Sequence, residues 1–389
     1  MTATVPDLQV PDLSDDALAA VTAEVGATAG EYDRTGGIPV AGLAAAHRAG
    51  LLTAAVGRQF GGPGVGLLDT ARILIALGEG DPSVALLAAN NLNVHRSQAT
   101  AEHWPAAYYA DLLRRSAEGP ALVNAVRAEP ELGAPARGGL PATVARRTAD
   151  GWSLTGRKAY ATGGRALAYH VVWAVADEPD GDPDTPRVGH LIVPADAPGI
   201  SWLDTWDHLG LRASNTHDVV YDEVPLPLDA FVEIPRVDGV YRDPAATAGL
   251  ASFGHPALYI GVARAARAAF VRYARERVPT ALGRPIATTE RIQTVAGEID
   301  AQIAQAETLL YGALLRGDEG HLPQLSLLKV QIARSVIAAV QTAVGALGNP
   351  ALSRHQPFER HLRDVLCVRV HPPQEDAALP AAGRRLLSA

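Results

Sequence analysis

Apolar and polar positions follow three different patterns along the chain, and the first is helical. Up to about Glu118 apolar residues recur every three or four positions, as they do across residues 67–77, which is typical of amphipathic helices. Glycine and proline interrupt this pattern at residues 61–64, where we expect a turn between helices. Residues 1–118 are therefore predicted to form an N-terminal helical domain.

Residues 119–236 instead show the two-residue alternation of β-strands. The acidic stretch 177–184 contains prolines and is expected to be a solvent-exposed loop. Short runs rich in Val, Ile and Trp are expected to form strands at residues 142–146, 152–155, 170–175 and 189–193. The middle domain is therefore predicted to be an antiparallel sheet or a small barrel.

Residues 237–389 return to helical spacing, in stretches too long to bury their apolar faces alone. Residues 257–277, 288–315 and 325–347 each keep one apolar face, so we expect them to pack together as a helical bundle. A lone subunit would leave apolar surface exposed, which predicts a homo-oligomer, with a tetramer expected. The whole chain is therefore predicted to have an α+β architecture.

Composition narrows the class of protein. Of the 389 residues 48% are hydrophobic and 20% charged, which is the balance of a folded globular protein. The net charge of −8 argues against a nucleic-acid partner. Acidic residues near the N-terminus argue against a signal peptide, and no uninterrupted apolar run reaches the length of a bilayer span. We expect a cytoplasmic protein without a membrane partner, and the single Cys367 excludes an intrachain disulfide.

Several common catalytic signatures are absent from the sequence. There is no GxGxxG after a predicted strand, no P-loop, no HExxH and no GxSxG. His95 and His103 have no acidic third ligand at a useful spacing, so structural or pocket-lining roles outweigh metal binding. We therefore expect no bound metal, and a site assembled from distant segments.

Four short motifs occur in order along nearly the whole chain. They are residues 58–64 with 80–86, 151–164, 209–220 and 357–364. Each is weak alone, but together they resemble the acyl-CoA dehydrogenases, which combine a helical domain, a β-domain and a four-helix bundle. The resemblance implies a flavoprotein of this fold.

The resemblance also implies which residues hold the flavin. Thr162 would face the flavin N5 and O4 atoms, with Tyr160 and Gly163 beside it in the β-domain hairpin. The alternatives are a plain strand residue for Thr162 and core packing for Tyr160.

The flavin tail is expected to reach the bundle of a neighbouring subunit. There Arg275 and Arg277 would grip phosphate, and Gln293 and Gly345 would make further contacts. The aromatic residue that dehydrogenases carry after this arginine is missing from residues 278–283, so FAD and FMN both stay open.

The carboxylate that a dehydrogenase needs is absent from both of its known positions. Acyl-CoA dehydrogenation requires a base to remove the α-proton of the thioester. Most members of the family carry a Glu at the position of Pro372, and a minority carry it at the position of Gly254. Glu375 is close in sequence but out of register.

His371 directly precedes Pro372 and resembles the catalytic histidine of the two-component flavin monooxygenases on this fold, the dibenzothiophene monooxygenase branch. Trp206 and Asn124 are similar to residues that lie beside the flavin in that branch, and Thr162 stands where the branch has a serine. A histidine suits acid–base chemistry because its unperturbed pKa lies near operating pH. A buried structural histidine is the alternative.

The resemblance therefore implies a flavin-dependent monooxygenase. It would receive reduced flavin, FMN or FAD, from a separate flavin reductase, react with O2 through a C4a-hydroperoxyflavin and oxygenate a small organic substrate. His371 would be the acid–base, Thr162 would bond near N5, and His95 and Trp206 would shape the pocket. The alternatives are an acyl-CoA or acyl-carrier-protein dehydrogenase with its base relocated, as to Glu375, and a non-catalytic member.

Overall fold

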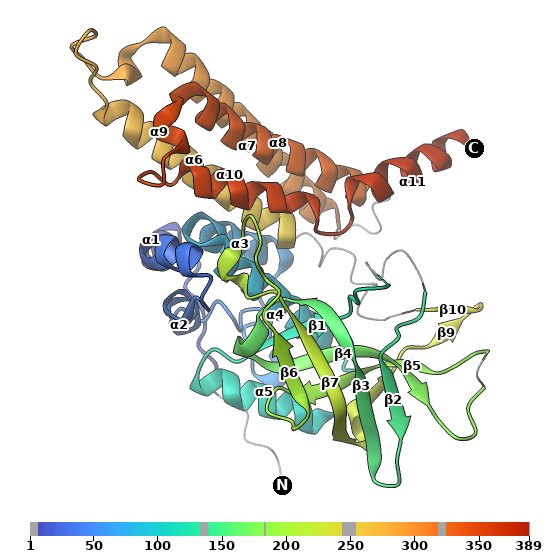
Figure 1. The fold of residues 1–389 in the computed structure, drawn as a ribbon. Coiled ribbons are helices and arrows are strands. Elements are labelled where there is room, and N and C mark those ends of the chain that lie inside the picture. Colours follow the sequence, from blue (N-terminus) through green and yellow to red (C-terminus); the bar gives the residue numbers. More distant parts are fainter. Residues whose placement is uncertain (1–6, 133–138, 183, 243–253, 318–323, 389) are drawn as a thin grey trace.

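The chain is described by a computed structural model that covers residues 7–132, 139–182, 184–242, 254–317 and 324–388. Figure 1 shows its three parts: N-terminal helices in blue, a sheet in green, and long helices in gold to red above both. The change from helix to strand falls after Glu118, and the strands extend to Tyr241, slightly beyond the boundary expected at residue 236.

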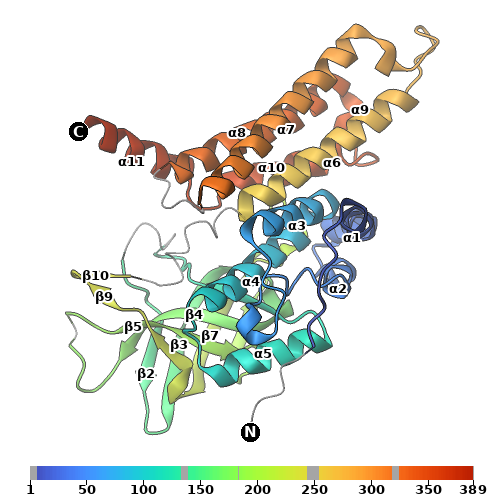
Figure 2. The ribbon, with the colours of Figure 1, turned by 180° about the vertical axis from the view of Figure 1, so that it is seen from behind.

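The ends of the N-terminal helices follow from their capping residues. These helices are α1 (Asp15–Thr35), α2 (Val40–Arg48), η1 (Arg58–Phe60), α3 (Leu67–Gly80), α4 (Pro82–Thr100) and α5 (Ala106–Glu118). α1 begins after Ser14, whose hydroxyl accepts a hydrogen bond from Ala17, and ends at Gly36 in the left-handed region. α3 confirms the helix predicted at residues 67–77. α5 packs against the sheet through Tyr109 (Figure 2).

The middle part is a mixed sheet of eight strands in the order β6-β7-β3-β2-β4-β5-β8, with β1 paired to β4. The strands are β1 (Leu122–Val126), β2 (Val144–Arg147), β3 (Gly151–Ala161), β4 (Leu167–Asp177), β5 (Val188–Pro194), β6 (Ile200–Leu203), β7 (His217–Pro227) and β8 (Phe231–Glu233), followed by the separate pair β9 (Arg236–Val237) and β10 (Val240–Tyr241).

The expectation of an antiparallel sheet is correct for most pairings but wrong for β4, which runs parallel to both β1 and β2. The two-residue alternation marks a strand but carries no information on its direction, which is set by how the connections cross the sheet.

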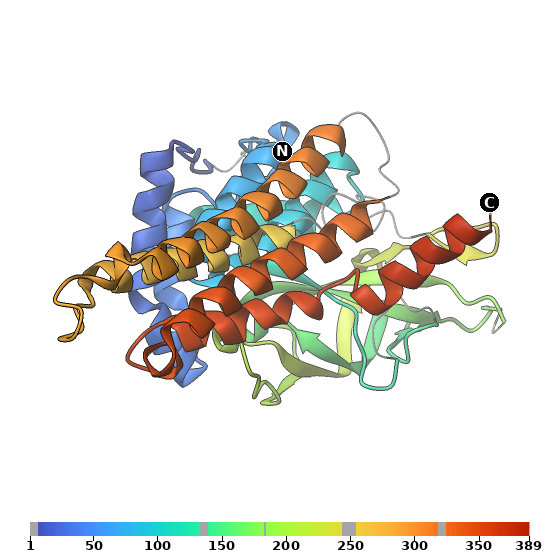
Figure 3. The same ribbon diagram turned by 90° about the horizontal axis from the view of Figure 1, so that it is seen from above.

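The C-terminal part is a bundle in which α6, α7, α8 and α10 pack together. The helices are α6 (Gly254–Glu276), α7 (Glu290–Gly317), α8 (Leu325–Leu347), α9 (Asn349–Leu352), α10 (Phe358–Leu366) and α11 (Glu375–Leu387). Figure 3 shows the long helices running side by side, with the red C-terminal helix extending beyond them. Among the described helices, α8 has the length and composition of a membrane span. Its apolar residues Ile332, Val336 and Val340 lie in the bundle core, which accounts for that composition.

The bundle and the N-terminal helices meet where α6 crosses α3. A Cβ atom on Gly78 would lie 2.1 Å from the carbonyl oxygen of Leu258, and one on Gly261 would lie 2.3 Å from that of Ile75. The two backbones are in contact, so only glycine fits at either position. This crossing fixes the start of α6 relative to α3 and α4.

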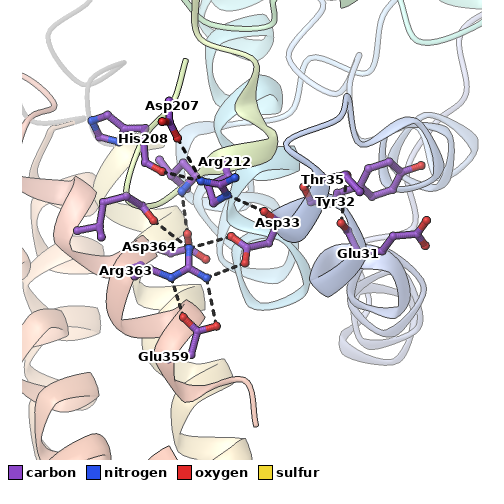
Figure 4. A network of polar contacts seen from close by, with 12 residues as sticks. Glu31, Tyr32, Asp33, Thr35, Asp207, His208, Arg212, Glu359, Arg363 and Asp364 are labelled. Carbon is purple, nitrogen blue, oxygen red and sulfur yellow. Dashed lines mark hydrogen bonds and ion pairs between the residues drawn. The ribbon is translucent and has the colours of Figure 1, made fainter. Parts of the chain in front are cut away.

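One ionic network joins all three parts of the chain (Figure 4). The Arg363 guanidinium in α10 donates to both carboxylate oxygens of Asp33 in α1, at 2.9 and 2.6 Å, and to the carbonyl oxygen of Leu209, at 2.9 Å. The neighbouring Asp364 accepts a hydrogen bond of 2.7 Å from the backbone N–H of Leu211. These contacts set the position of α10 against both other parts.

We expect Arg363→Met to lower the free energy of unfolding by about 2 to 4 kcal/mol, because it removes one partner of a shielded, bidentate ion pair. The side chains of Arg363 and Asp33 are only 20% and 13% exposed. Urea unfolding measures the change. The matched control is Arg146→Met, since Arg146 and Asp177 are 70% and 54% exposed and their pair should contribute at most about 1 kcal/mol. Equal losses in the two variants would contradict this prediction.

We expect the stability of the protein relative to Asp364→Asn to fall as pH rises. Burial raises the pKa of Asp364 from 3.8 to about 7, so the folded carboxyl keeps a proton that the unfolded chain loses. The stabilisation is present at low pH. It is lost as pH rises from the unfolded pKa of 3.8 to the folded pKa of about 7, and the loss should be at least about 1 kcal/mol. The asparagine keeps an oxygen for Leu211 but does not titrate. Unfolding curves of both proteins at several pH values test this, and a constant difference would rule it out.

Candidate functional site

The hydroxyl of Thr162, just after β3, lies at the end of a short chain of hydroxyl groups. Thr216 donates to Thr162 Oγ1 at 3.1 Å, and the hydroxyls of Ser214 and Thr216 are 2.7 Å apart. The side-chain amide of Asn124 in β1 donates to the Thr162 carbonyl oxygen at 2.9 Å. Because Thr162 Oγ1 is the acceptor in this chain, its own proton is left to donate outward. The structure thus brings Asn124 and Thr162 together.

Tyr160 and Gly163 flank Thr162 in unusual backbone conformations. Tyr160 has a φ of 56°, in the left-handed region, and its side chain is 65% exposed. Gly163 has a φ of 103°, and its N–H donates to the Ser214 carbonyl oxygen at 3.0 Å. A non-glycine residue at positive φ costs about 1 to 3 kcal/mol and is found most often at functional sites. The core-packing alternative for Tyr160 does not fit this exposure.

Trp206 is held beside the end of β3. Its backbone N–H donates to His217 Nδ1 at 3.1 Å, and His217 pairs with Ala161 of β3. Its indole N–H donates to the Leu211 carbonyl oxygen at 3.1 Å. The indole stacks on the His208 ring, with centroids 4.2 Å apart and an interplanar angle of 6°. Trp206 thus lies in the same part of the middle domain as Thr162.

His371 follows the short helix η8 (Cys367–Arg369) and faces the first turns of α6. Its ring stacks on His255, with centroids 4.7 Å apart and an angle of 8°, and lies 5.7 Å from the Tyr259 ring. The Lys329 ammonium in α8 donates to the carbonyl oxygens of Val368 and His371, each at 2.8 Å. His371 Nε2 is shielded from solvent and has no hydrogen-bond partner among the described residues.

Burial lowers the pKa of His371 well below its usual value, and His255, Lys329 and His208 lower it further. His371 is therefore neutral at physiological pH. The pKa of His371 thus departs from the unperturbed value near operating pH, because the sequence could show neither the burial nor the neighbouring Lys329 ammonium. A neutral imidazole can accept one hydrogen bond and donate another.

His95 makes no described contact with His371. It is fully buried in α4, its Nδ1 is 3.1 Å from the Tyr109 hydroxyl, and burial lowers its pKa to about 4. Its ring packs in the helical domain, and among the described contacts none joins it to His371. A pocket-lining role for His95 thus gains no support from its contacts.

The four residues expected to hold the flavin tail lie at the opposite end of the bundle from His371. Arg275 is in the last turn of α6 and Arg277 follows it, while Gln293 is near the start of α7 and Gly345 near the end of α8. All four are exposed. A hydrogen bond of 3.0 Å from Arg291 to the Ala346 carbonyl oxygen shows that the start of α7 and the end of α8 are adjacent. These residues share one surface that is separate from the His371 group.

Neither of the two positions that carry the catalytic base in acyl-CoA dehydrogenases has a carboxylate in this chain. Gly254 begins α6, and Pro372 follows His371. Glu375 begins α11, where it is exposed and forms an ion pair with Arg334 that lowers its pKa. This pair lies in a groove of about 900 Å³ together with Val370 and Leu379. No described contact turns Glu375 towards His371.

Three residues of the group around His371 were missed by the sequence analysis: His255, Tyr259 and His208. His208 lies in the Trp206 motif, and His255 directly follows the glycine tested as a base position. None of the three had a signal of its own, and His255 and Tyr259 meet His371 only because α6 packs against the segment after α10.

Comparisons with known proteins agree with this architecture. Three family models match: the acyl-CoA dehydrogenase N-terminal domain at residues 12–103, the middle domain at 125–224 and the C-terminal domain at 250–371. YdbM of Bacillus subtilis, whose name assigns it to the acyl-CoA dehydrogenases, is 29% identical over 358 residues, covering 90% of this chain and 91% of that protein.

Two further matches are a nitrososynthase and the solved structure of KijD3. L-evernosamine nitrososynthase of a Micromonospora species is 31% identical over 374 residues, covering 90% of this chain and 84% of its own. The solved structure of KijD3 with FMN and a dTDP-linked amino sugar has a TM-score of 0.80 at 27% identity, covering 99% of this chain and 97% of that one. With three domain models in order along its length and relatives aligned over nine-tenths of it, the chain belongs to the acyl-CoA dehydrogenase family.

Proposed function

We propose that this protein is a flavin-dependent monooxygenase that uses reduced flavin and O2 to oxygenate a small organic substrate. The observation that carries the proposal is the set of titratable groups that act on the pKa of His371: two histidines and a lysine, with no carboxylate among those described. Dehydrogenation of a thioester needs a carboxylate or similar base to take the α-proton. A neutral histidine cluster beside a lysine suits hydrogen bonding and proton transfer to an oxygenated substrate better.

The residues at the end of β3 fit a flavin ring. Thr162 has a hydroxyl proton that no described group accepts, Tyr160 offers an exposed aromatic side chain, and Trp206 lies beside them. Asn124 would complete the cradle through the amide atoms that are not bonded to Thr162, and Gly163 would allow a close approach to the backbone. When bound, reduced FMN or FAD supplies the electrons for activation of O2. A separate reductase would deliver it, since the chain has no dinucleotide fingerprint of its own.

The chain's own contribution is to hold and shield the reacting groups. Lys329 fixes the backbone of His371, so that the imidazole stays against His255. His371 Nε2 can then hold or take one proton at the substrate. The shielding of this atom keeps water away, which favours transfer of oxygen to the substrate over its loss as hydrogen peroxide.

The name of YdbM favours dehydrogenation as the second candidate function. Such an activity would need a base at a position other than Pro372 and Gly254. Glu375 forms an ion pair with Arg334 at the surface. Butyryl-CoA therefore distinguishes the two candidate functions, because only a dehydrogenase would transfer electrons from butyryl-CoA to the bound flavin.

The exposed end of the bundle supports a site shared between subunits. Arg275 and Arg277 have no ion-pair partner among the described contacts, and a side chain at Gly345 would meet open space. We expect these groups, with Gln293, to contact the flavin tail of a neighbouring copy in a homotetramer.

We expect His371→Ala to lower the amount of oxygenated product per reduced FMN about a hundredfold, with hydrogen peroxide rising in its place, because the proton-transferring group is lost. The probe is the dTDP-linked amino sugar bound by KijD3, supplied with a flavin reductase, NADH and O2. His103→Ala, at the surface of the helical domain, is the control. If His371→Ala left the product yield per flavin unchanged, His371 would have no catalytic role. Rapid anaerobic reduction of bound flavin by butyryl-CoA would overturn the monooxygenase proposal itself.

We expect the double variant Arg275→Ala/Arg277→Ala to bind flavin about ten times more weakly, because charge-assisted hydrogen bonds to phosphate are lost. Its tetrameric mass by light scattering should not change. Arg316→Ala, an exposed arginine at the other end of α7, is the matched control. Flavin affinity that stays the same, or a monomeric chain at micromolar concentration, would contradict the shared site.

A further inference from the structure

Three buried polar atoms that have no hydrogen-bond partner among the described residues lie together where α6 begins: His255 Nδ1, the Tyr259 hydroxyl and His371 Nε2. His255 and Tyr259 are one turn apart on α6, and both rings contact the His371 ring. Leaving one such atom unsatisfied costs about 1 to 3 kcal/mol, and native structures contain few of them. Three in one place indicate that a ligand supplies the missing bonds.

The state of His255 is fixed by its neighbour in α4. His255 Nε2 lies 3.2 Å from the side-chain oxygen of Asn90. An amide oxygen can only accept a hydrogen bond, so Nε2 carries the ring proton and Nδ1 keeps a free lone pair. The second ring nitrogen is therefore a buried acceptor that no described group donates to.

Burial and the nearby Lys329 ammonium lower the pKa of His255 to about 4. The ring is neutral at physiological pH, and the positive charge of Lys329 opposes its protonation. The same charge disfavours a cationic ligand at this place. The group that satisfies His255 is therefore a neutral N–H or O–H.

We propose that His255 Nδ1 is the hydrogen-bond acceptor for an uncharged N–H or O–H group of the substrate, with Asn90 as the positioning residue that sets its tautomer. Tyr259 offers its hydroxyl proton to an acceptor on the same ligand. The substrate class is thus a neutral amine, heteroaromatic N–H or hydroxyl compound. This role rests on the proposed function only in taking the ligand to be the molecule that is oxygenated.

Binding of two matched probes to the full chain saturated with FMN tests the proposal. Indole has one neutral N–H, and 1-methylindole has the same ring without it. By calorimetry the unmodified protein should bind indole about ten times more tightly, which corresponds to one net hydrogen bond. His255→Phe keeps a ring against His371 but removes the lone pair, so the preference should disappear. Asn90→Leu should reduce it, and the control His103→Phe should retain it.

Equal affinity for both probes in the unmodified protein, or a preference for indole that survives in His255→Phe, would overturn the proposal. A long-range ¹H–¹⁵N spectrum of the histidines gives a second test that needs no variant: His255 Nδ1 should carry no proton, and a protonated Nδ1 would also overturn it. Neither measurement involves turnover. A protein that failed to oxygenate any substrate could still show the preference, so the two proposals fail separately.

Discussion

The ion pair between Arg363 and Asp33 and the hydrogen bond from Leu211 to Asp364 hold α10 against both other parts of the chain. Each contact joins residues that are far apart in sequence, and the pair is largely shielded from solvent. Because α10 leads directly through η8 to His371, the same contacts determine where this histidine lies. The residues from Asp207 to Arg212 follow Trp206, so the network also fixes the segment that carries the indole.

A second constraint acts from the opposite side of His371. The close crossing of α3 and α6 at Gly78 and Gly261 leaves no room for a side chain, so the start of α6 cannot slide along the helical domain. His255 is thereby placed between Asn90 of α4 and the His371 ring. One rigid contact positions each histidine, and their stacking is the result of both.

The local elements could be predicted from the sequence. Residues 67–77 and 325–347 form helices and residues 170–175 lie in a strand, as their periodicity indicates. Helical and strand spacing follow from bonds within a few residues, so they are visible in the order of side chains. The direction of β4 was not predictable, because it depends on connections that cross the whole sheet.

The sequence by itself determined that no carboxylate stands at Pro372 or Gly254, and that His371, Thr162 and Trp206 stand at positions that resemble those of the flavin monooxygenases on this fold. The tertiary structure decided which of these meet. It stacked His255 on His371, it keeps both rings neutral through burial and the Lys329 ammonium, and it buried His95 against Tyr109. Residue type is a local property, whereas proximity, burial and the resulting pKa arise only when distant segments pack together.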